Sequence, residues 1–185
     1  MGKFTSDEIK KSYLKLLNLR PVNKITVRDI ADDCGINRNT FYYHFADLPT
    51  LLEDMIEEQA EEIIDSFPTI GTVEQAFDVA MKFALDNKKA AYHIYNSASR
   101  DLFDRFMMKM CNYVVSRYLD SLFAEQNVCE SDRRLIVSLY ASECFGLVYD
   151  WLLNGMKGDI KGDFLRICEL RRGMVEETVK RCKHI

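Results

Sequence analysis

Residues 26–45 read TVRDIADDCGINRNTFYYHF, and this stretch decides how the chain folds. It contains two short helical patterns that are separated by Gly35. Thr26 and Asp29 have the spacing of a capping box, in which each side chain bonds to the other residue's backbone N–H. Gly35 can adopt a positive φ at little cost, and Asn37 is a preferred residue at the start of a helix. The stretch therefore predicts two short helices joined by a tight glycine turn, as in a helix-turn-helix.

The second of these helices carries an unusual number of hydrogen-bonding side chains. Phe41 and Phe45 lie one turn apart and are expected to be buried together, which leaves Asn39 and Tyr43 pointing outward. An amide such as Asn39 can form two hydrogen bonds with adenine in the major groove of DNA, and the guanidinium of Arg38 can do so with guanine. This helix is therefore expected to read base edges.

Groups that suit phosphate oxygens surround the same helix. Tyr42 and His44 lie on its flanks, and Thr26 and Arg28 lie at the start of the preceding helix, where free backbone N–H groups favour phosphate. The alternative is a short polar helix whose tyrosines pack at a seam between domains. The predicted DNA-binding residues are Thr26, Arg28, Arg38, Asn39, Thr40, Tyr42, Tyr43 and His44.

The distribution of charge agrees with this placement. The formal net charge is −4, yet residues 1–50 contain eight Lys and Arg against six Asp and Glu. Residues 51–70 contain seven acidic residues and no basic one, and we interpret them as a solvated face. The N-terminal segment is therefore the candidate basic surface.

Apolar residues recur at spacings of three and four along the whole chain, and only 3 Pro and 8 Gly interrupt them among 185 residues. The fold class is therefore predicted to be all-α, with about nine helices. An N-terminal three-helix DNA-binding domain is expected at residues 1–48, and a helical bundle for effector binding and dimerisation at residues 49–185. The last five helices are predicted at 72–86, 88–96, 100–125, 131–153 and 160–182.

Several function classes find no support in the sequence. The six cysteines form no C-x-x-C pair, and the chain lacks an apolar N-terminal run and an uninterrupted membrane-spanning stretch. No H-E-x-x-H, G-x-x-x-x-G-K-[ST] or G-x-S-x-G motif is present. We expect a cytoplasmic protein with no membrane span, no metal, no cofactor and no enzymatic activity.

The stretch KITVRDIADDCGINRNTFYYHFADLPTLLEDM, residues 24–55, resembles the DNA-binding domain of the TetR family of transcriptional regulators. The resemblance implies that residues 38–44 form the recognition helix of a homodimer that binds a palindromic double-stranded DNA operator. The string GINRNTFYYHF is most similar to regulators of the dihydroxyacetone-kinase-operon type, and residues 151–159 resemble their C-terminal end more weakly. The residues that carry the resemblance are Thr26, Ile30, Ala31, Gly35, Ile36, Thr40, Phe41, Tyr42, His44, Phe45, Leu51 and Leu52.

One feature departs from the family pattern. The family usually has a phosphate-binding lysine at the start of its fourth helix, where this chain has Ala46, Asp47 and Leu48. Phosphate affinity is then expected to depend more on Lys24, Arg28, Tyr42 and His44. The affinity for DNA should also fall less steeply as the salt concentration rises.

Aromatic and methionine side chains crowd residues 72–126. They are explained either by a packed helical core or by a largely apolar cavity with a few polar groups that orient a small-molecule effector. The resemblance favours a cavity. The predicted ligand-binding residues are Phe83, Tyr92, Tyr95, Phe103, Phe106, Met107, Met110 and Tyr113.

The last two predicted helices each carry a stripe of apolar or small residues. Small residues at a spacing of four allow another helix to approach closely, so the two stripes are expected to build a four-helix interface with a second copy. The alternative is that both stripes face the chain's own core. The predicted interface residues are Ser138, Ser142, Gly146, Phe164, Cys168 and Val175.

These expectations combine into a regulator that an effector releases from DNA or repositions on it. Two alternatives stay open: a transcriptional activator controlled by a partner protein, and a helical ligand-binding protein without DNA function.

Overall fold

The computed structural model describes residues 2–182, apart from the side chains of residues 2–4, 73 and 121. The part of the chain that it describes folds into ten α-helices and one short 3-10 helix. The all-α fold class is confirmed. The elements are α1 (Gly2–Leu17), η1 (Val22–Lys24), α2 (Val27–Cys34), α3 (Arg38–His44), α4 (Leu48–Ser66), α5 (Val73–Asp86), α6 (Lys88–Tyr95), α7 (Arg100–Glu125), α8 (Glu130–Leu153), α9 (Ile160–Leu170) and α10 (Met174–Lys180).

The predicted last helix, residues 160–182, is wrong in one respect. It is interrupted after Leu170, and α10 begins only at Met174. Gly173 precedes α10 with a φ of 83°, a left-handed conformation that glycine adopts without steric cost. Because glycine is also a poor helix former, the chain turns here instead of continuing one helix.

The caps predicted around the helix-turn-helix are present. Thr26 and Asp29 form the reciprocal capping box of α2. Gly35 ends that helix with a φ of 66°, and the side chain of Asn37 accepts a hydrogen bond of 2.8 Å from the backbone N–H of Thr40. The local sequence therefore fixes both ends of the turn between α2 and α3.

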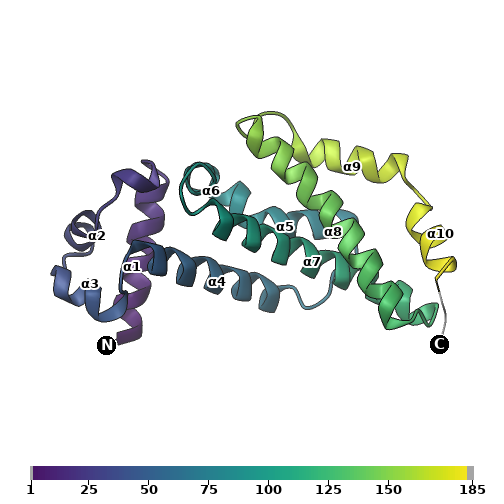
Figure 1. Ribbon diagram of the computed structural model, residues 1–185, viewed down its shortest axis with the longest axis horizontal. Coiled ribbons are helices and arrows are strands. Elements are labelled where there is room, and N and C mark those ends of the chain that lie inside the picture. The colour runs from purple at the N-terminus through teal and green to yellow at the C-terminus, as the bar shows by residue number, and fades with distance from the viewer. Residues whose placement is uncertain (1, 183–185) are drawn as a thin grey trace. The chain divides into compact units, whose positions relative to one another are not determined.

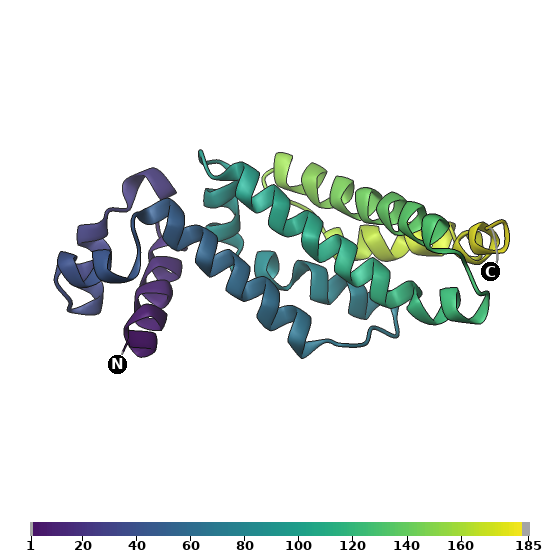
Figure 2. The same ribbon diagram turned by 60° about the horizontal axis from the view of Figure 1, so that its bottom comes forward.

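A shared apolar core holds α1, α2 and α3 together. Ile9, Tyr13 and Leu17 form a buried stripe on α1. Ile30 of α2 and Phe41 of α3 are also fully buried, and the three helices contact one another. Figures 1 and 2 both show α2 and α3 beside α1. The three helices thus position the outer face of α3.

The described chain divides into two compact units. The first unit contains the residues up to Glu62 together with Phe83–Phe106, and the second contains Ile63–Lys82 and the residues from Met107 onward. The division passes through α4, α5 and α7. The boundary predicted after residue 48 separates the two expected functional domains and not these compact units. It stays a prediction.

In the second unit, α8 is apolar yet largely uncovered. Among the described residues it is the one helix that is long and apolar enough to cross a membrane, by length and composition alone, and only 28% of its most apolar stretch is buried. Figure 2 shows α9 beside α8. Leu135, Leu139 and Leu153 on α8 are exposed to solvent.

Candidate nucleic-acid interface and ligand cavity

The outer face of α3 has the arrangement that the sequence predicted. Phe41 is fully buried and Phe45 retains 6% exposure, whereas Tyr43 is 83% exposed. Arg38 and Asn39 are also exposed, and Thr40 is half-buried. The side chains that could reach base edges are therefore free of the first unit's own core.

Ring contacts orient the exposed tyrosines of α3. Tyr42 meets the buried Phe41 edge-on, with ring centroids 5.5 Å apart and an interplanar angle of 87°. Tyr43 meets His44 in the same manner at 5.1 Å and 89°. Edge-to-face contacts of this kind restrict the side chains, so the phenol groups are held ready for an external partner.

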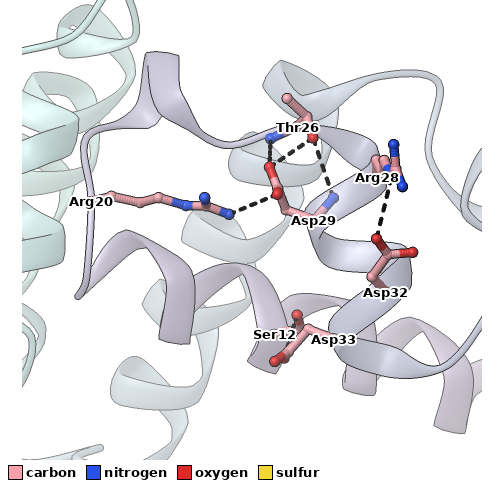
Figure 3. Close-up of polar contacts among 7 residues, drawn as sticks. All are labelled: Ser12, Arg20, Thr26, Arg28, Asp29, Asp32 and Asp33. Carbon is pink, nitrogen blue, oxygen red and sulfur yellow. Dashed lines mark hydrogen bonds and ion pairs between the residues drawn. The ribbon is translucent and has the colours of Figure 1, made fainter.

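The start of α2 is held in place by one carboxylate that interacts with several groups. Asp29 accepts hydrogen bonds from the backbone N–H of Thr26 at 2.8 Å and from its hydroxyl at 2.7 Å, and it pairs with Arg20 at 3.1 Å (Figure 3). The bonds from Thr26 and then the Arg20 charge lower the pKa of Asp29. The Thr26 hydroxyl proton is thus engaged within the chain.

Three cations on this side of the first unit are available to phosphate. Lys24 and Arg38 are exposed and form no ion pair among the residues that the structure describes. Arg28 is 71% exposed, and its Nε lies 3.4 Å from the carboxylate of Asp32 (Figure 3). A pair this long and exposed contributes little, so a phosphate can displace it.

A brace between α1 and α2 was not foreseen from the sequence. Asp33, near the end of α2, accepts hydrogen bonds from Lys15 at 2.6 Å and from Ser12 at 2.8 Å. The bonds from Lys15 and Ser12 lower the pKa of Asp33. No local pattern could reveal this contact, since its partners are 18 and 21 residues away.

The start of α4, where the sequence departs from the family pattern, also has a structural role. The Asp47 carboxylate accepts a 2.8 Å hydrogen bond from the backbone N–H of Thr50 and so caps α4. That bond lowers the pKa of Asp47. Within the stretch where the family usually has a lysine, Asp47 therefore stabilises the helix start.

Two family descriptions match the chain. "Bacterial regulatory proteins, tetR family" matches residues 14–55, and "Transcriptional regulator C-terminal region" matches residues 71–169. The chain belongs to the TetR family of transcriptional regulators.

Individual relatives agree with this membership. The uncharacterized HTH-type transcriptional regulator YxbF of Bacillus subtilis (strain 168) is 29% identical over 70 residues, which are 36% of this chain and 18% of that protein. Among solved structures, the dihydroxyacetone kinase operon activator DhaS has a TM-score of 0.72 at 16% identity, covering 97% of this chain and 98% of that one. The fatty acid degradation regulator FadR from Bacillus halodurans has a TM-score of 0.63 at 15% identity, covering 96% and 97%. At these identities the two structures show a shared fold.

The second unit of this TetR-family chain holds a cavity of about 700 Å³. Helices α5, α7, α8 and α9 and the start of α10 line it. Its buried wall includes Phe77, Met81, Cys111 and Val114, and Phe164 packs against Phe77 with ring centroids 5.0 Å apart. A volume of this size suits a small organic molecule.

The eight predicted ligand-binding residues lie elsewhere. None of them lines this cavity. In the first unit, Phe83, Tyr95, Phe103 and Phe106 form a buried aromatic cluster with ring centroids 5.6–6.4 Å apart. Tyr92 is 41% exposed.

The remaining three belong to α7 in the second unit. Met107 and Met110 are buried, and the hydroxyl of Tyr113 donates a 2.6 Å hydrogen bond to the carbonyl of Phe67, just after α4. A ligand role for the eight residues stays a prediction. Most residues that line the cavity have the same apolar character as core residues, so no sequence signal distinguished them.

The predicted dimer residues fall into two groups. On α8, Ser138, Ser142 and Gly146 are exposed, and a Cβ added to Gly146 would meet no atom within 4 Å. By contrast Phe164, Cys168 and Val175 are half-buried and line the cavity of their own unit. A role for either group in a dimer stays a prediction.

Proposed function

We propose that this TetR-family regulator binds a palindromic DNA operator as a homodimer, with one α3 in the major groove of each half-site. The observation that carries the proposal is the outer face of α3, where Arg38, Asn39, Tyr42 and Tyr43 are exposed while Phe41 anchors the helix from behind. One short helix offers few base contacts, so two copies on half-sites about one DNA turn apart are needed for a specific complex.

The surface of α8 supports the dimer. Leu135, Leu139 and Leu153 are 69%, 52% and 59% exposed, and Ser142 and Gly146 lie exposed on the same helix. An exposed apolar patch that includes small residues suits a helix of a second copy. Gly146 has no close neighbour in its own chain that would require a glycine, which is consistent with a contact from outside.

The cavity of the second unit supports control by a small-molecule effector in the cytoplasm. Helices of the family's C-terminal region line it, and its volume of about 700 Å³ suits a small organic molecule. Effector and operator are then coupled if the ligand favours one of two spacings of the recognition helices.

Selection of duplexes from a random pool, followed by fluorescence anisotropy, tests the DNA assignment. We expect the selected sequences to contain two inverted half-sites, and log K to fall linearly with log of the salt concentration because bound phosphates release counterions. Binding that ignores salt, or selected sequences without two-fold symmetry, would refute the proposal. Analytical ultracentrifugation with the selected duplex should give two chains per operator.

A further inference from the structure

Two carboxylates in the acidic stretch of α4 bind a cation of α1. The Lys10 ammonium donates a 2.7 Å hydrogen bond to Glu58 and lies 2.6 Å from a carboxylate oxygen of Asp54. Asp54 and Glu58 are four residues apart, so they lie one turn apart on the same face of α4 and reach the same nitrogen atom. We call these three side chains the Lys10 clamp.

The ammonium group of the clamp is largely withdrawn from water. The Lys10 side chain is 13% exposed, whereas that of its neighbour Lys11 is 72% exposed. Burial alone would lower the pKa of Lys10, but the hydrogen bonds and charges of Asp54 and Glu58 raise it above its ordinary value. Lys10 is therefore charged at neutral pH, and its charge is satisfied by α4.

The clamp joins the helix-turn-helix to the helix that follows it. Because α1 packs closely on α2 and α3, a contact that holds α1 also holds α3. All three clamp residues belong to the first unit, and α4 continues past Glu62 into the second unit, which carries the exposed surface of α8. In a dimer formed through α8, a change in the angle between α1 and α4 would therefore change the distance between the two α3 helices.

Apolar burial alone leaves this angle free to vary. Leu51, Leu52, Met55 and Ile56 of α4 are buried, but hydrophobic contact is non-directional and permits small rotations. The clamp restricts both distance and direction, because two carboxylates have to stay within hydrogen-bonding reach of one nitrogen. Ion pairs with exposed carboxylates contribute little net stability, so the clamp is expected to affect orientation more than stability.

We propose that the Lys10 clamp fixes the orientation of the helix-turn-helix relative to α4 and so makes the protein selective for the length of the spacer between the two operator half-sites. Lys10 is then a positioning residue, which acts through α3 and not through a base contact of its own. This inference rests on the proposed function, because spacer length matters only to a dimer on a palindromic operator.

Fluorescence anisotropy on duplexes of different spacer length tests the proposal with the full chain. The duplexes are the one selected from the random pool, two whose spacer is one base pair longer or shorter, and one with a substituted base pair in each half-site. One base pair of spacer rotates a half-site by about 35° and shifts it by about 3.4 Å. We expect the wild type to bind both altered spacers about tenfold more weakly, and K10M to bind them within about threefold of the selected duplex.

The duplex with substituted half-sites separates positioning from folding. Methionine keeps the apolar stem of lysine and removes its charge, so K10M should reject the substituted half-sites as strongly as the wild type does. K10R keeps the charge and should restore the spacer selectivity, whereas D54N/E58Q removes the partners and should behave as K10M does. The matched control is K11M, because Lys11 pairs at 2.9 Å with Glu8 of its own helix. It should keep the spacer selectivity of the wild type.

A double-mutant cycle tests the contact itself without DNA. K10M leaves two like charges one turn apart on α4, so its midpoint in urea denaturation should lie below that of the wild type. Addition of D54N/E58Q removes these charges, and the combined variant should have a midpoint at or above that of K10M. Additive shifts of the midpoint would overturn the clamp.

The DNA measurements have three further outcomes that would overturn the proposal. These are a K10M variant with the spacer selectivity of the wild type, a K10M variant that also accepts substituted half-sites, and a wild type that binds all three spacers equally. If K10M does not fold, D54N/E58Q provides the same comparison, and failure of both to fold would assign the clamp to folding alone.

The selected duplex separates this inference from the proposed function. If the pool yields no palindrome, the proposed function fails and the spacer role of Lys10 fails with it. If a palindrome is selected and K10M keeps full spacer selectivity, the DNA assignment stands and only the inference about Lys10 is wrong.

Discussion

The imidazole Nδ1 of His93 in α6 lies 2.7 Å from the carbonyl oxygen of Leu17, the last residue of α1. Since a carbonyl oxygen only accepts, Nδ1 carries the proton and donates it. Asn18 adds a second contact between the same segments, because its side-chain oxygen accepts a 3.3 Å hydrogen bond from the backbone N–H of Ala90. Helix α6 is thus fastened to α1 within the first unit.

Removal of either contact should loosen α6. We expect His93→Ala and Asn18→Ala each to reduce the free energy of unfolding by about 1 kcal/mol, the usual net contribution of a hydrogen bond. Urea denaturation measures this change, and hydrogen exchange should show faster exchange in residues of α6. Lys89→Ala, an exposed change on the same helix, is the control and should do neither. Unchanged exchange in α6 for both variants would show that the contacts do not hold it.

Loss of the hydroxyl should affect the stability of the protein differently at Tyr13 and at Tyr113. The Tyr13 hydroxyl is buried without a hydrogen-bond partner among the described residues, and burial raises its pKa to about 12. Tyr13→Phe is therefore expected to leave stability unchanged or to raise it. Tyr113→Phe removes the bond to the Phe67 carbonyl and should cost about 1 kcal/mol. Thermal denaturation of the two variants checks the contrast, and a clear loss of stability in Tyr13→Phe would contradict it.

The capping box of α2 predicts a stability difference that depends on pH. Hydrogen bonds from Thr26, followed by the Arg20 charge, lower the pKa of Asp29 below its ordinary value of 3.8. A lowered carboxylate pKa stabilises the folded state above 3.8, and this stabilisation is lost as the pH falls through the folded-state pKa. Asp29→Asn should therefore melt at a lower temperature than the wild type at pH 7, with the difference shrinking below pH 3.8.

Circular dichroism melts of Asp29→Asn and of the control Asp32→Asn measure this effect. Asp32 is exposed and lies outside the capping box, so its variant should melt close to the wild type at every pH. If the difference in melting temperature between Asp29→Asn and the wild type stayed constant from pH 7 to pH 3, the charged Asp29 carboxylate would not be the source of the stabilisation.

Two substitutions in the first unit should separate base reading from phosphate binding. Asn39→Ala should lower discrimination between operator and mismatched duplex by about 1–3 kcal/mol, since a paired contact to a base edge is lost. Arg28→Ala should weaken binding to all duplexes similarly and reduce the slope of log K against log salt by about 0.9. Anisotropy titrations at four salt concentrations distinguish the two. Equal effects of both variants on operator and mismatched DNA would count against α3 as the reading helix.

Gly146→Arg should separate dimerisation from folding. A side chain at this position meets open space in its own chain, so the helix should form normally, whereas a charge on the exposed face of α8 opposes a second copy. We expect a monomer by light scattering, unchanged helical circular dichroism, and weaker operator binding. Ser66→Arg, an exposed change at the end of α4, is the control and should remain dimeric. A dimeric Gly146→Arg would place the interface elsewhere.

The local sequence determined the helix-turn-helix because each of its signals acts within a few residues. Thr26 bonds to Asp29, Asn37 caps the helix that starts at the next residue, and Gly35 takes the left-handed turn. The spacing of Phe41 and Phe45 likewise fixes which face of α3 is buried, and hence that Asn39 and Tyr43 point outward. Capping, turn geometry and helical periodicity need no distant partner.

Only the tertiary structure decided which apolar residues fill the core and which surround a cavity. Phe103 and Phe164 are both aromatic residues at helical spacing, yet the first lies in a closed cluster and the second lines an open space. The sequence also did not predict the hydrogen bond from Lys15 to Asp33 or the one from His93 to Leu17. The physical reason is that a side chain's periodicity predicts its direction on its own helix, whereas its neighbours depend on how helices far apart in sequence pack together.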